Sequence, residues 1–407
     1  MRFELFFAHR LSTRKGSGLS QRVLRIGVTA VAISMVVMII SIATGLGLQR
    51  RITEKITSFT GHLQIVPYIG PEDREKPLIS ADSIREVLML DPDVAFVQGV
   101  SEKGGILKTE IDFEGVMVKG LDSSFNWGGF EQYLRSGVLP NYTGEDYNDA
   151  ILISDYLLNR LQLKLGDTVA VFFIREASKP PLIRKFTLCG TYSTGMETFD
   201  KEYILADHKH LSRILKWQKG DYGHLEIFLK EDAKVLEVTD RWIAKLPLYA
   251  DTYTARERYP DIYQWVGLFD VNIYFILLIM ILVGMVNTMT ALITIILEKK
   301  KAIGLLKALG ASNQQLRELF RYRSIHILLQ GLFWGNTIGI GLCLLQKHFE
   351  WIKLDPEIYY VSSVPIELNL WILLSLNLVI IAIGFLSMSL PVRIIGKMDP
   401  AEALRTF

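Results

Sequence analysis

The sequence predicts an integral membrane α-helical protein with four transmembrane helices and a large α+β domain between helices 1 and 2. Two observations predict this class. Half of the 407 residues are hydrophobic and 22% are charged, which is typical of a chain that is part membrane-embedded and part soluble. Four segments also reach the roughly 20 apolar residues that a bilayer span needs, and none contains Asp, Glu, Lys or Arg. These segments are residues 26–48, 271–297, 324–346 and 368–392.

Loop charges predict the orientation of the spans, because positively charged loops stay on the cytoplasmic side. Residues 1–25 carry six basic side chains against one acidic, and residues 298–323 carry seven against two. The tail 393–407 adds three more basic side chains, whereas the loop 347–367 is mainly acidic. We therefore expect a multi-pass protein of the bacterial inner membrane with both termini in the cytoplasm. The loop 347–367 and the domain 49–270 are then periplasmic in a Gram-negative cell.

The ends of the first two spans suggest a mechanical role. Residues 3–11 are predicted to form an interfacial helix on the inner leaflet, followed by a flexible elbow at residues 16–18. The first span continues into a polar helical pattern outside the membrane, and the second span is preceded by one. Two such helices either transmit motion between compartments or are simply long.

The segment between the first two spans alternates strand-like and helix-like patterns and predicts two small α+β lobes. β-Branched and aromatic residues predict strands at 62–68, 105–109, 115–119, 150–154, 168–174, 183–192, 201–205 and 224–229. Amphipathic spacing predicts helices at 80–90, 154–165, 207–217 and 233–246, with Ser80, Ser154 and Asp207 as N-caps.

One predicted hairpin has an unusual tip. Its strands flank residues 175–182, in which Ser178 and Lys179 precede Pro180 and Pro181. A Pro-Pro tip has little conformational entropy left to lose on binding, so it suits a docking site. The alternative is an ordinary surface hairpin.

The basic loop 298–323 is predicted to be a short amphipathic helix, a turn and a second helix. Ile303, Leu305, Leu306 and Leu309 supply apolar positions, and residues 310–312 are typical of a helix end followed by a new start. The loop is either held by lipid headgroups or is a docking helix for a cytoplasmic partner. In the second interpretation Leu305, Leu306 and Leu309 make the contacts.

Polar and small residues inside the spans predict how the helices associate. Gly331, Gly335 and Gly339 share one face of the third span and allow close packing. Asn287, Asn336 and Asn377 lie in three different spans and either bond across helices or simply face the interior. The lack of charged residues argues against a proton or ion pathway.

The sequence contains none of the common catalytic or metal-binding motifs. The net charge of +2 does not favour nucleic-acid binding, and no P-loop, H-E-x-x-H, C-x-x-C or G-x-S-x-G motif occurs. The one close histidine pair, His208 and His210, is expected on a solvated helix surface, so no metal site is predicted. Cys189 falls in a predicted strand and Cys343 in a predicted span, and no disulfide is expected between them.

The order of the predicted spans resembles that of the MacB/FtsX-type ABC transporter permeases. Members of that family have one span, a large outer domain and three more spans. The run EKKKAIGLLKALGAS resembles the coupling-helix motif of that family, with Ala302 where a Glu is usual, and DPAEALR at 399–405 resembles its ending. Three runs resemble the lipoprotein-releasing LolC/LolE branch: FFAHRLSTRKGSG, YYVSSVPI at 359–366, and LCGTYSTG followed by DKEYILA.

The resemblance implies a non-catalytic permease subunit, with no cofactor of its own, because ATP and Mg are bound by a separate cytoplasmic ABC ATPase dimer. It implies a second permease subunit, identical or homologous, an acylated lipoprotein substrate, contact with membrane lipids and a periplasmic lipoprotein carrier. The ATPase-coupling residues would be Glu298, Lys301, Ile303, Gly304, Leu305, Leu306, Lys307, Ala308, Leu309, Gly310 and Ala311. The carrier-docking hairpin would be Ser178, Lys179, Pro180 and Pro181, although it is short for that role.

Acyl chains would need an apolar surface near the outer halves of the first two spans. The candidates are Met35, Met38, Ile39, Ile42, Ile273, Phe275, Ile276 and Met280, each of which equally suits lipid contact or helix packing. Two other functions stay open. They are a MacB-like efflux or mechanotransmission permease, and an FtsX-like regulator of a periplasmic cell-wall hydrolase.

Overall fold

The computed structural model describes residues 18–68, 76–109, 112–144, 146–175, 180–387 and 391. It divides into two compact units. The helical unit comprises the described parts of Met1–Gln49, Val266–Lys353 and Ser363–Phe407, and the sheet unit comprises those of Arg50–Trp265 and Leu354–Ser362. The predicted interfacial helix at 3–11 and the ending 399–405 lie outside the described residues.

Within the described residues, four helices are long and apolar enough to cross a membrane. They are α2 (Gly18–Thr60), α10 (Pro260–Glu298), α12 (Asn313–Phe349) and α14 (Leu370–Ser387), and the short α11 (Lys300–Ala308) lies between α10 and α12. The first three predicted spans lie within α2, α10 and α12, and α14 covers residues 370–387 of the fourth. Helices α2 and α10 each contribute residues to both units.

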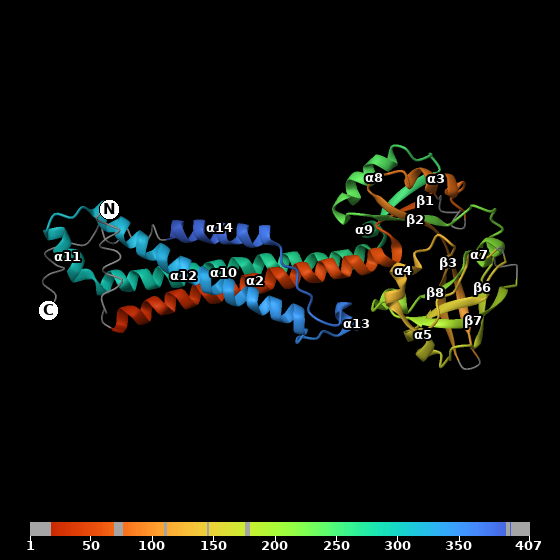
Figure 1. Cartoon of the computed structure of the whole chain (residues 1–407), viewed down its shortest axis with the longest axis horizontal. Coiled ribbons are helices and arrows are strands. Elements are labelled where there is room, and N and C mark those ends of the chain that lie inside the picture. The colour runs from red at the N-terminus through yellow and green to blue at the C-terminus, as the bar shows by residue number, and fades with distance from the viewer. Residues whose placement is uncertain are drawn as a thin grey trace. The chain divides into compact units, whose positions relative to one another are not determined.

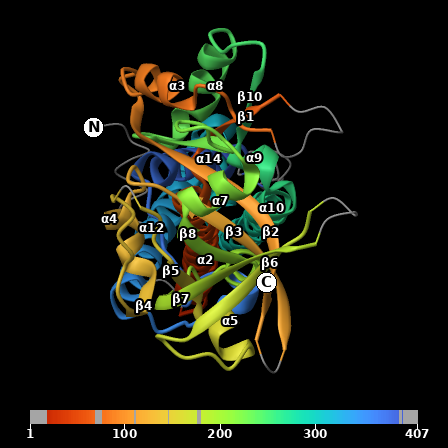
Figure 2. The ribbon, with the colours of Figure 1, turned by 90° about the vertical axis from the view of Figure 1, so that its right-hand side faces the viewer.

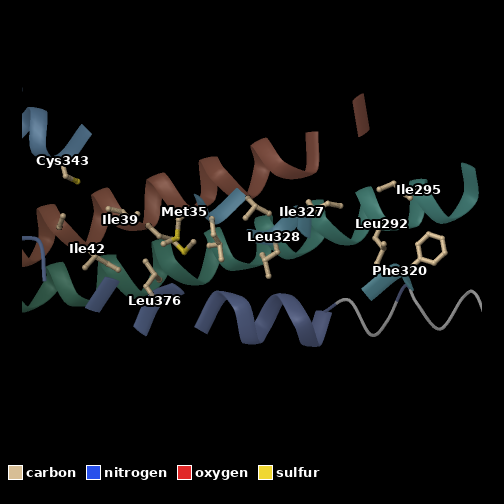
Figure 3. Close-up of a cluster of buried hydrophobic side chains, with 14 of the residues drawn as sticks. Met35, Ile39, Ile42, Leu292, Ile295, Phe320, Ile327, Leu328, Cys343 and Leu376 are labelled. Atoms are coloured by element: carbon tan, nitrogen blue, oxygen red, sulfur yellow. The ribbon is translucent and has the colours of Figure 1, made fainter. Parts of the chain in front are cut away.

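The glycine face predicted on the third span packs against α2, so the two helix axes approach closely (Figure 1). A Cβ at Gly331 would lie 2.6 Å from Val31, and one at Gly335 would lie 2.5 Å from Met35 Cβ. The α2 side chains that cover these glycines belong to the core of the helical unit (Figure 3).

An asparagine pair joins α12 to α14. Asn336 Nδ2 donates to Asn377 Oδ1 at 2.8 Å, and Asn377 Nδ2 donates to Asn336 Oδ1 at 3.1 Å. Each Nδ2 also donates to the carbonyl one turn earlier on its own helix. Of the two interpretations of the intramembrane asparagines, cross-helix bonding therefore holds for Asn336 and Asn377. Asn287 is half-buried on α10.

Short helices and a mixed sheet make up the sheet unit. Its strands are β1 (Leu63–Pro67), β2 (Val94–Lys108), β3 (Phe113–Leu121), β4 (Leu134–Gly137), β5 (Ala150–Ser154), β6 (Thr168–Phe173), β7 (Leu182–Tyr192), β8 (Tyr203–Asp207), β9 (His224–Leu229) and β10 (Ala250–Thr254). Its helices are α3 (Ala81–Leu88), α4 (Trp127–Phe130), η1 (Glu131–Tyr133), α5 (Asp155–Arg160), α6 (Glu197–Asp200), α7 (His208–Leu215), η2 (Asp232–Lys234), α8 (Val235–Ile243), α9 (Ala255–Arg258) and α13 (Pro356–Tyr359).

In the part of the chain that the structure describes, the sheet has ten strands in the order β10-β1-β9-β2-β3-β8-β5-β7-β4, and β6 pairs with both β2 and β7. The strands β2, β3, β8, β5, β7 and β6 therefore close into a ring. One hydrophobic core fills it and includes Val118, Phe186 and Ile204, with α5 and α7 covering its ends. Closure leaves these six strands without a free edge over the paired residues.

A second core lies between the open part of the sheet and two helices. Leu63, Leu225 and Ile227 of the strands β1 and β9 pack against Ile84 of α3 and Trp242 of α8. Figure 2 shows α3 and α8 together at this end of the sheet. The sequence predicts two lobes, and the structure has two cores on one continuous sheet, joined by the long strand β2.

In the edge strand β10, the backbone N–H groups that face away from β1 are bonded to local acceptors. The bonds from Ala255 N to His62 O and from Tyr68 N to Tyr249 O fix which residues of β10 face β1. The alternate residues face outwards, and each of their N–H groups has a local acceptor. Ala250 donates to Pro247 O, Thr252 to Asp251 Oδ1 and Thr254 to Glu257 Oε2.

Some predicted elements differ from the structure. The first part of β2, residues 94–104, is not predicted, and neither are β4 and β10. Ser154 and Asp207 cap their helices as predicted, accepting from Leu157 N and Lys209 N. The prediction that Ser80 caps α3 is wrong, because Ser80 has φ +57° and its side chain makes no cap bond.

The glycine contact gives a stability prediction. Gly335→Ala places a methyl group against Met35 and should lower the free energy of unfolding by about 1–3 kcal/mol through overpacking. Gly341→Ala on the same helix is the control, because nothing lies within 4 Å of its Cβ. Thermal unfolding of the purified chain in detergent measures both variants. Equal shifts for the two would contradict the assigned contact.

Candidate functional site

The predicted coupling segment forms α11 and a sharp turn. Gly310 has φ +94°, a left-handed conformation that glycine adopts without strain. Its N–H donates to Lys307 O at 3.0 Å, and Ala311 N–H donates to Leu306 O at 2.9 Å. Together these bonds form a Schellman cap, which ends the helix and reverses the chain.

The next helix begins at once. Ser312 Oγ accepts from Gln315 N, and the Gln315 side chain accepts from Ser312 N, which is a capping box. The predicted end and new start at residues 310–312 are therefore confirmed. The turn is fixed by local bonds, so it holds α11 in a defined orientation to α12.

The two faces of α11 differ. Ile303 is 2% exposed and packs into the core of the helical unit, and Leu306 packs against the same core. Leu305 and Leu309 are 54% and 76% exposed. Of the three leucines predicted to contact a partner, Leu305 and Leu309 are exposed and Leu306 is half-buried.

The remaining predicted coupling residues lie around these two leucines. Lys301, Ala308 and Gly310 are exposed, Gly304 is buried, and Glu298, Lys307 and Ala311 are half-buried. Leu297, at the end of α10, is 56% exposed. The segment therefore offers apolar side chains and basic residues on an outer face while its inner face is anchored.

The predicted docking hairpin is formed by β6 and β7, which pair from Thr168↔Thr187 to Phe173↔Leu182. Ser178 and Lys179 lie outside the described residues. Pro180 and Pro181 are described and exposed. The paired strands hold the base of the hairpin in place, as the sequence predicts.

The candidate acyl surface is not brought together on the outside of the chain. Met35, Met38, Ile39, Ile42 and Ile273 belong to the core of the helical unit. Figure 3 labels Met35, Ile39 and Ile42 of this set. Met35 and Ile39 are covered because they pack on Gly335 and Gly339 of α12. Ile276 and Met280 are half-buried, and Phe275 is 57% exposed.

A buried ion pair anchors the end of α2 in the sheet unit. Lys119 Nζ donates to Glu226 Oε1 at 2.7 Å, and both side chains are 1% exposed. The same ammonium donates to Phe59 O at 2.5 Å, close to the end of α2, and lies 4.4 Å from the centre of the Phe59 ring. Gln98 donates to the second carboxylate oxygen. A helix-end carbonyl therefore finds a charged donor inside the core.

The carboxyl of Glu226 is ionised by this arrangement. Burial alone would raise its pKa, but the Lys119 ammonium and the hydrogen bonds from His224 and Lys119 lower the pKa to about 2. No local sequence pattern marks this pair, because 107 residues separate its members and each looks like an ordinary surface charge in a strand.

Lys55 of α2 connects two of the runs that carry the family resemblance. Its ammonium donates to Tyr360 O at 2.7 Å, within the run 359–366. A Cβ at Gly195, within the run 188–195, would lie 2.7 Å from the same nitrogen. The glycine thus leaves room for the ammonium. Nothing in the sequence pattern alone marks Lys55.

The two histidines expected on a solvated surface are buried, so that prediction is wrong. His208 is 8% exposed, bonds to Ser101 Oγ and Ser212 Oγ, and stacks on Tyr222. His210 is 4% exposed and bonds to Asn148 O. Burial lowers the pKa of both rings.

No metal site is found in the part of the chain that is described, where His, Cys, Asp and Glu form no group of three or more that is placed to hold a metal ion. Cys189 and Cys343 are free thiols.

The Lys119–Glu226 pair gives a second prediction. Lys119→Met leaves a buried carboxylate without its partner and should cost about 3–5 kcal/mol of unfolding free energy. The double variant Lys119→Met/Glu226→Leu removes both charges and should recover part of that loss, because Phe59 O and the Gln98 amide still lose their partners. Urea unfolding of the full chain in detergent, followed by circular dichroism, measures both.

The pH dependence follows from the lowered pKa. The stability that ionised Glu226 contributes is present above its unfolded pKa, about 4.5, and is lost as the pH falls towards 2. Glu226→Gln should flatten this part of the acid-unfolding profile. A variant that retains the wild-type profile would contradict the assigned role.

Comparison with known proteins finds one family match and several similar relatives. Residues 274–400 match the family described as FtsX-like permease C-terminal. The lipoprotein-releasing system transmembrane protein LolC of Xylella fastidiosa is 20% identical and covers 97% of this chain and 96% of its own length. LolE of Haemophilus influenzae is 19% identical, with 92% of each chain covered. LolC of Neisseria meningitidis is 19% identical, with 97% of each covered.

Two solved structures are also similar. The periplasmic region of MacB from Actinobacillus actinomycetemcomitans matches with a TM-score of 0.34 and 14% identity, covering 49% of this chain and 92% of that one. The extracellular domain of the transporter YknZ from Gram-positive bacteria matches with a TM-score of 0.32 and 11% identity, covering 47% and 99%.

With its four long apolar helices and its permease relatives, the chain is a multi-pass membrane protein. Residues 274–400 are an FtsX-like permease domain, and the resemblance to the MacB/FtsX-type permeases, including LolC and LolE, is confirmed.

Proposed function

We propose that this chain is the permease subunit of an ABC transporter that releases lipoproteins from the inner membrane and passes them to a periplasmic carrier. The observation that supports this most is similarity to LolC over 97% of this chain and 96% of the relative, because it includes the outer domain as well as the permease domain. The chain would bind no nucleotide itself. A separate cytoplasmic ATPase would bind ATP and Mg, and a second permease subunit would complete the transporter.

Helix α11 is the proposed contact with the ATPase. Its inner side is fixed by Ile303 and by the Schellman cap at Gly310, so a push on the outer side moves the helix as a unit. The outer side presents Leu305 and Leu309. Exposed leucines beside basic residues fit a groove on a partner protein better than they fit bulk water.

Helices α2 and α10 are the proposed transmission elements, because each contributes residues to both units. In the sheet unit, the end of α2 is held by Lys119 at Phe59 O and by Lys55 at Tyr360 O. An anchored helix end transfers displacement to the sheet, whereas a frayed end would absorb it.

Energetics favour a handover between apolar surfaces. Burying an acyl chain is worth about 0.8 kcal/mol per CH₂, so three chains of about 14 such groups total roughly 30 kcal/mol. Full exposure of such chains to water is therefore too costly for one nucleotide cycle. All four candidates on α2 are buried and Ile276 and Met280 of α10 are half-buried, so Phe275 on α10 is the candidate most accessible to a chain.

The coupling proposal predicts the effect of a charge on α11. Leu309→Glu should lower the vanadate-sensitive ATPase activity that copurifies with the chain at least tenfold, because the carboxylate would be desolvated in the contact. Asn313→Glu is the control, since it adds the same charge to an exposed position four residues away. Unchanged activity in Leu309→Glu would remove α11 from the contact.

The carrier proposal predicts a crosslink from the hairpin. A photo-crosslinking residue at Pro180 should capture a small lipoprotein-carrier protein in living cells, identified by mass spectrometry. The same residue at Leu248, which is fully exposed elsewhere in the sheet unit, is the control and should not. Capture of a cell-wall hydrolase or an efflux-channel adaptor would instead favour one of the other two functions. Capture of a sister permease alone would make the hairpin an ordinary surface loop.

A further inference from the structure

A small cavity lies where the four long helices of the helical unit meet. Its volume is about 30 Å³, and α2, α10, α12 and α14 all contribute to its wall. Three hydroxyl groups line it: Ser34 of α2, Thr288 of α10 and Ser387 of α14. The rest of the wall is apolar and includes Met38, Met280 and Met285.

Two of the three hydroxyl groups are already donors. Thr288 Oγ1 donates to Gly284 O at 2.7 Å, and Ser387 Oγ donates to Gly384 O at 2.8 Å. This is the usual arrangement of Ser and Thr in membrane helices, and it leaves the oxygen lone pairs free to accept.

Ser34 is different. It is 3% exposed, and among the described residues its Oγ has no hydrogen-bond partner. The space in front of it is kept open by Gly284, where a Cβ would lie 3.5 Å from Ser34 Oγ. A buried hydroxyl without a partner needs an explanation, and where two further hydroxyl residues line the same cavity the usual one is bound water.

We propose that this cavity is a water-binding site inside the helical unit. The water accepts a hydrogen bond from Ser34 and donates to the lone pairs of Thr288 and Ser387. At about 10–15 Å³ for each water, the cavity has room for about two.

Hydroxyl-radical footprinting tests this proposal, since radicals formed from bound water oxidise adjacent methionines. Met38 and Met35 are a matched pair on α2, at 2% and 0% exposure. Only Met38 of these two lines the cavity, whereas Met35 covers Gly335 of α12. In the wild-type chain in lipid nanodiscs, Met38 should be oxidised at least fivefold faster than Met35. This comparison needs no variant.

The variants locate the water at Ser34. Ser34→Val replaces the hydroxyl with methyl groups and should lower the oxidation rate of Met38 to that of Met35. Ser41→Ala, on the same helix but not lining the cavity, should leave the rate unchanged. Equal rates for Met38 and Met35 in the wild type would show that the cavity is dry or the whole core wet, and either result overturns the proposal. An undiminished Met38 rate in Ser34→Val would overturn the role of Ser34.

Discussion

The packing of the helical unit is constrained by the absence of charged residues from its four apolar segments. Lipid tails offer no hydrophobic gain when two such helices meet, so they must associate through close van der Waals contact and neutral hydrogen bonds. The glycine face of α12 provides the first and the Asn336–Asn377 pair the second. Helix α2 is more deeply buried than α10 as a result. The surface left for lipid or for another chain is therefore mainly on α10 and α14.

In the sheet unit, by contrast, charged groups are buried in the core. A helix that ends inside a core leaves carbonyl groups without donors, and each unpaired group is costly. Here an ammonium meets the carbonyl of Phe59, and the ammonium is in turn neutralised by Glu226. A buried ion pair is a poor source of net stability, but its geometry is demanding. The pair thus serves to fix one position of the helix end relative to the strands.

Sequence patterns were sufficient for features that are local. The spans, the glycine face, the Gly310 turn and most strands follow from periodicity, composition and turn chemistry within a few residues. The failures have a common cause. The first part of β2 contains Gln98, Ser101 and Lys103, which are polar residues that only the surrounding strands and helices bury. Burial of His208 and pairing of Lys119 with Glu226 likewise depend on segments more than 100 residues away. For the candidate site, the pattern identified α11 but did not separate Leu306 from Leu305 and Leu309, because that distinction needs the packing partner of the helix.

The bonded N–H groups of the edge strand β10 affect how copies of this chain associate in a membrane. Copies of a membrane protein are confined to two dimensions, so their exposed domains meet at high effective concentration. An open strand edge would let the sheets of neighbouring copies join one to the next and grow into a polymer. The outward N–H groups of β10 already donate to the carboxylates of Asp251 and Glu257 and to the carbonyl of Pro247. This edge is thus closed to indiscriminate strand addition.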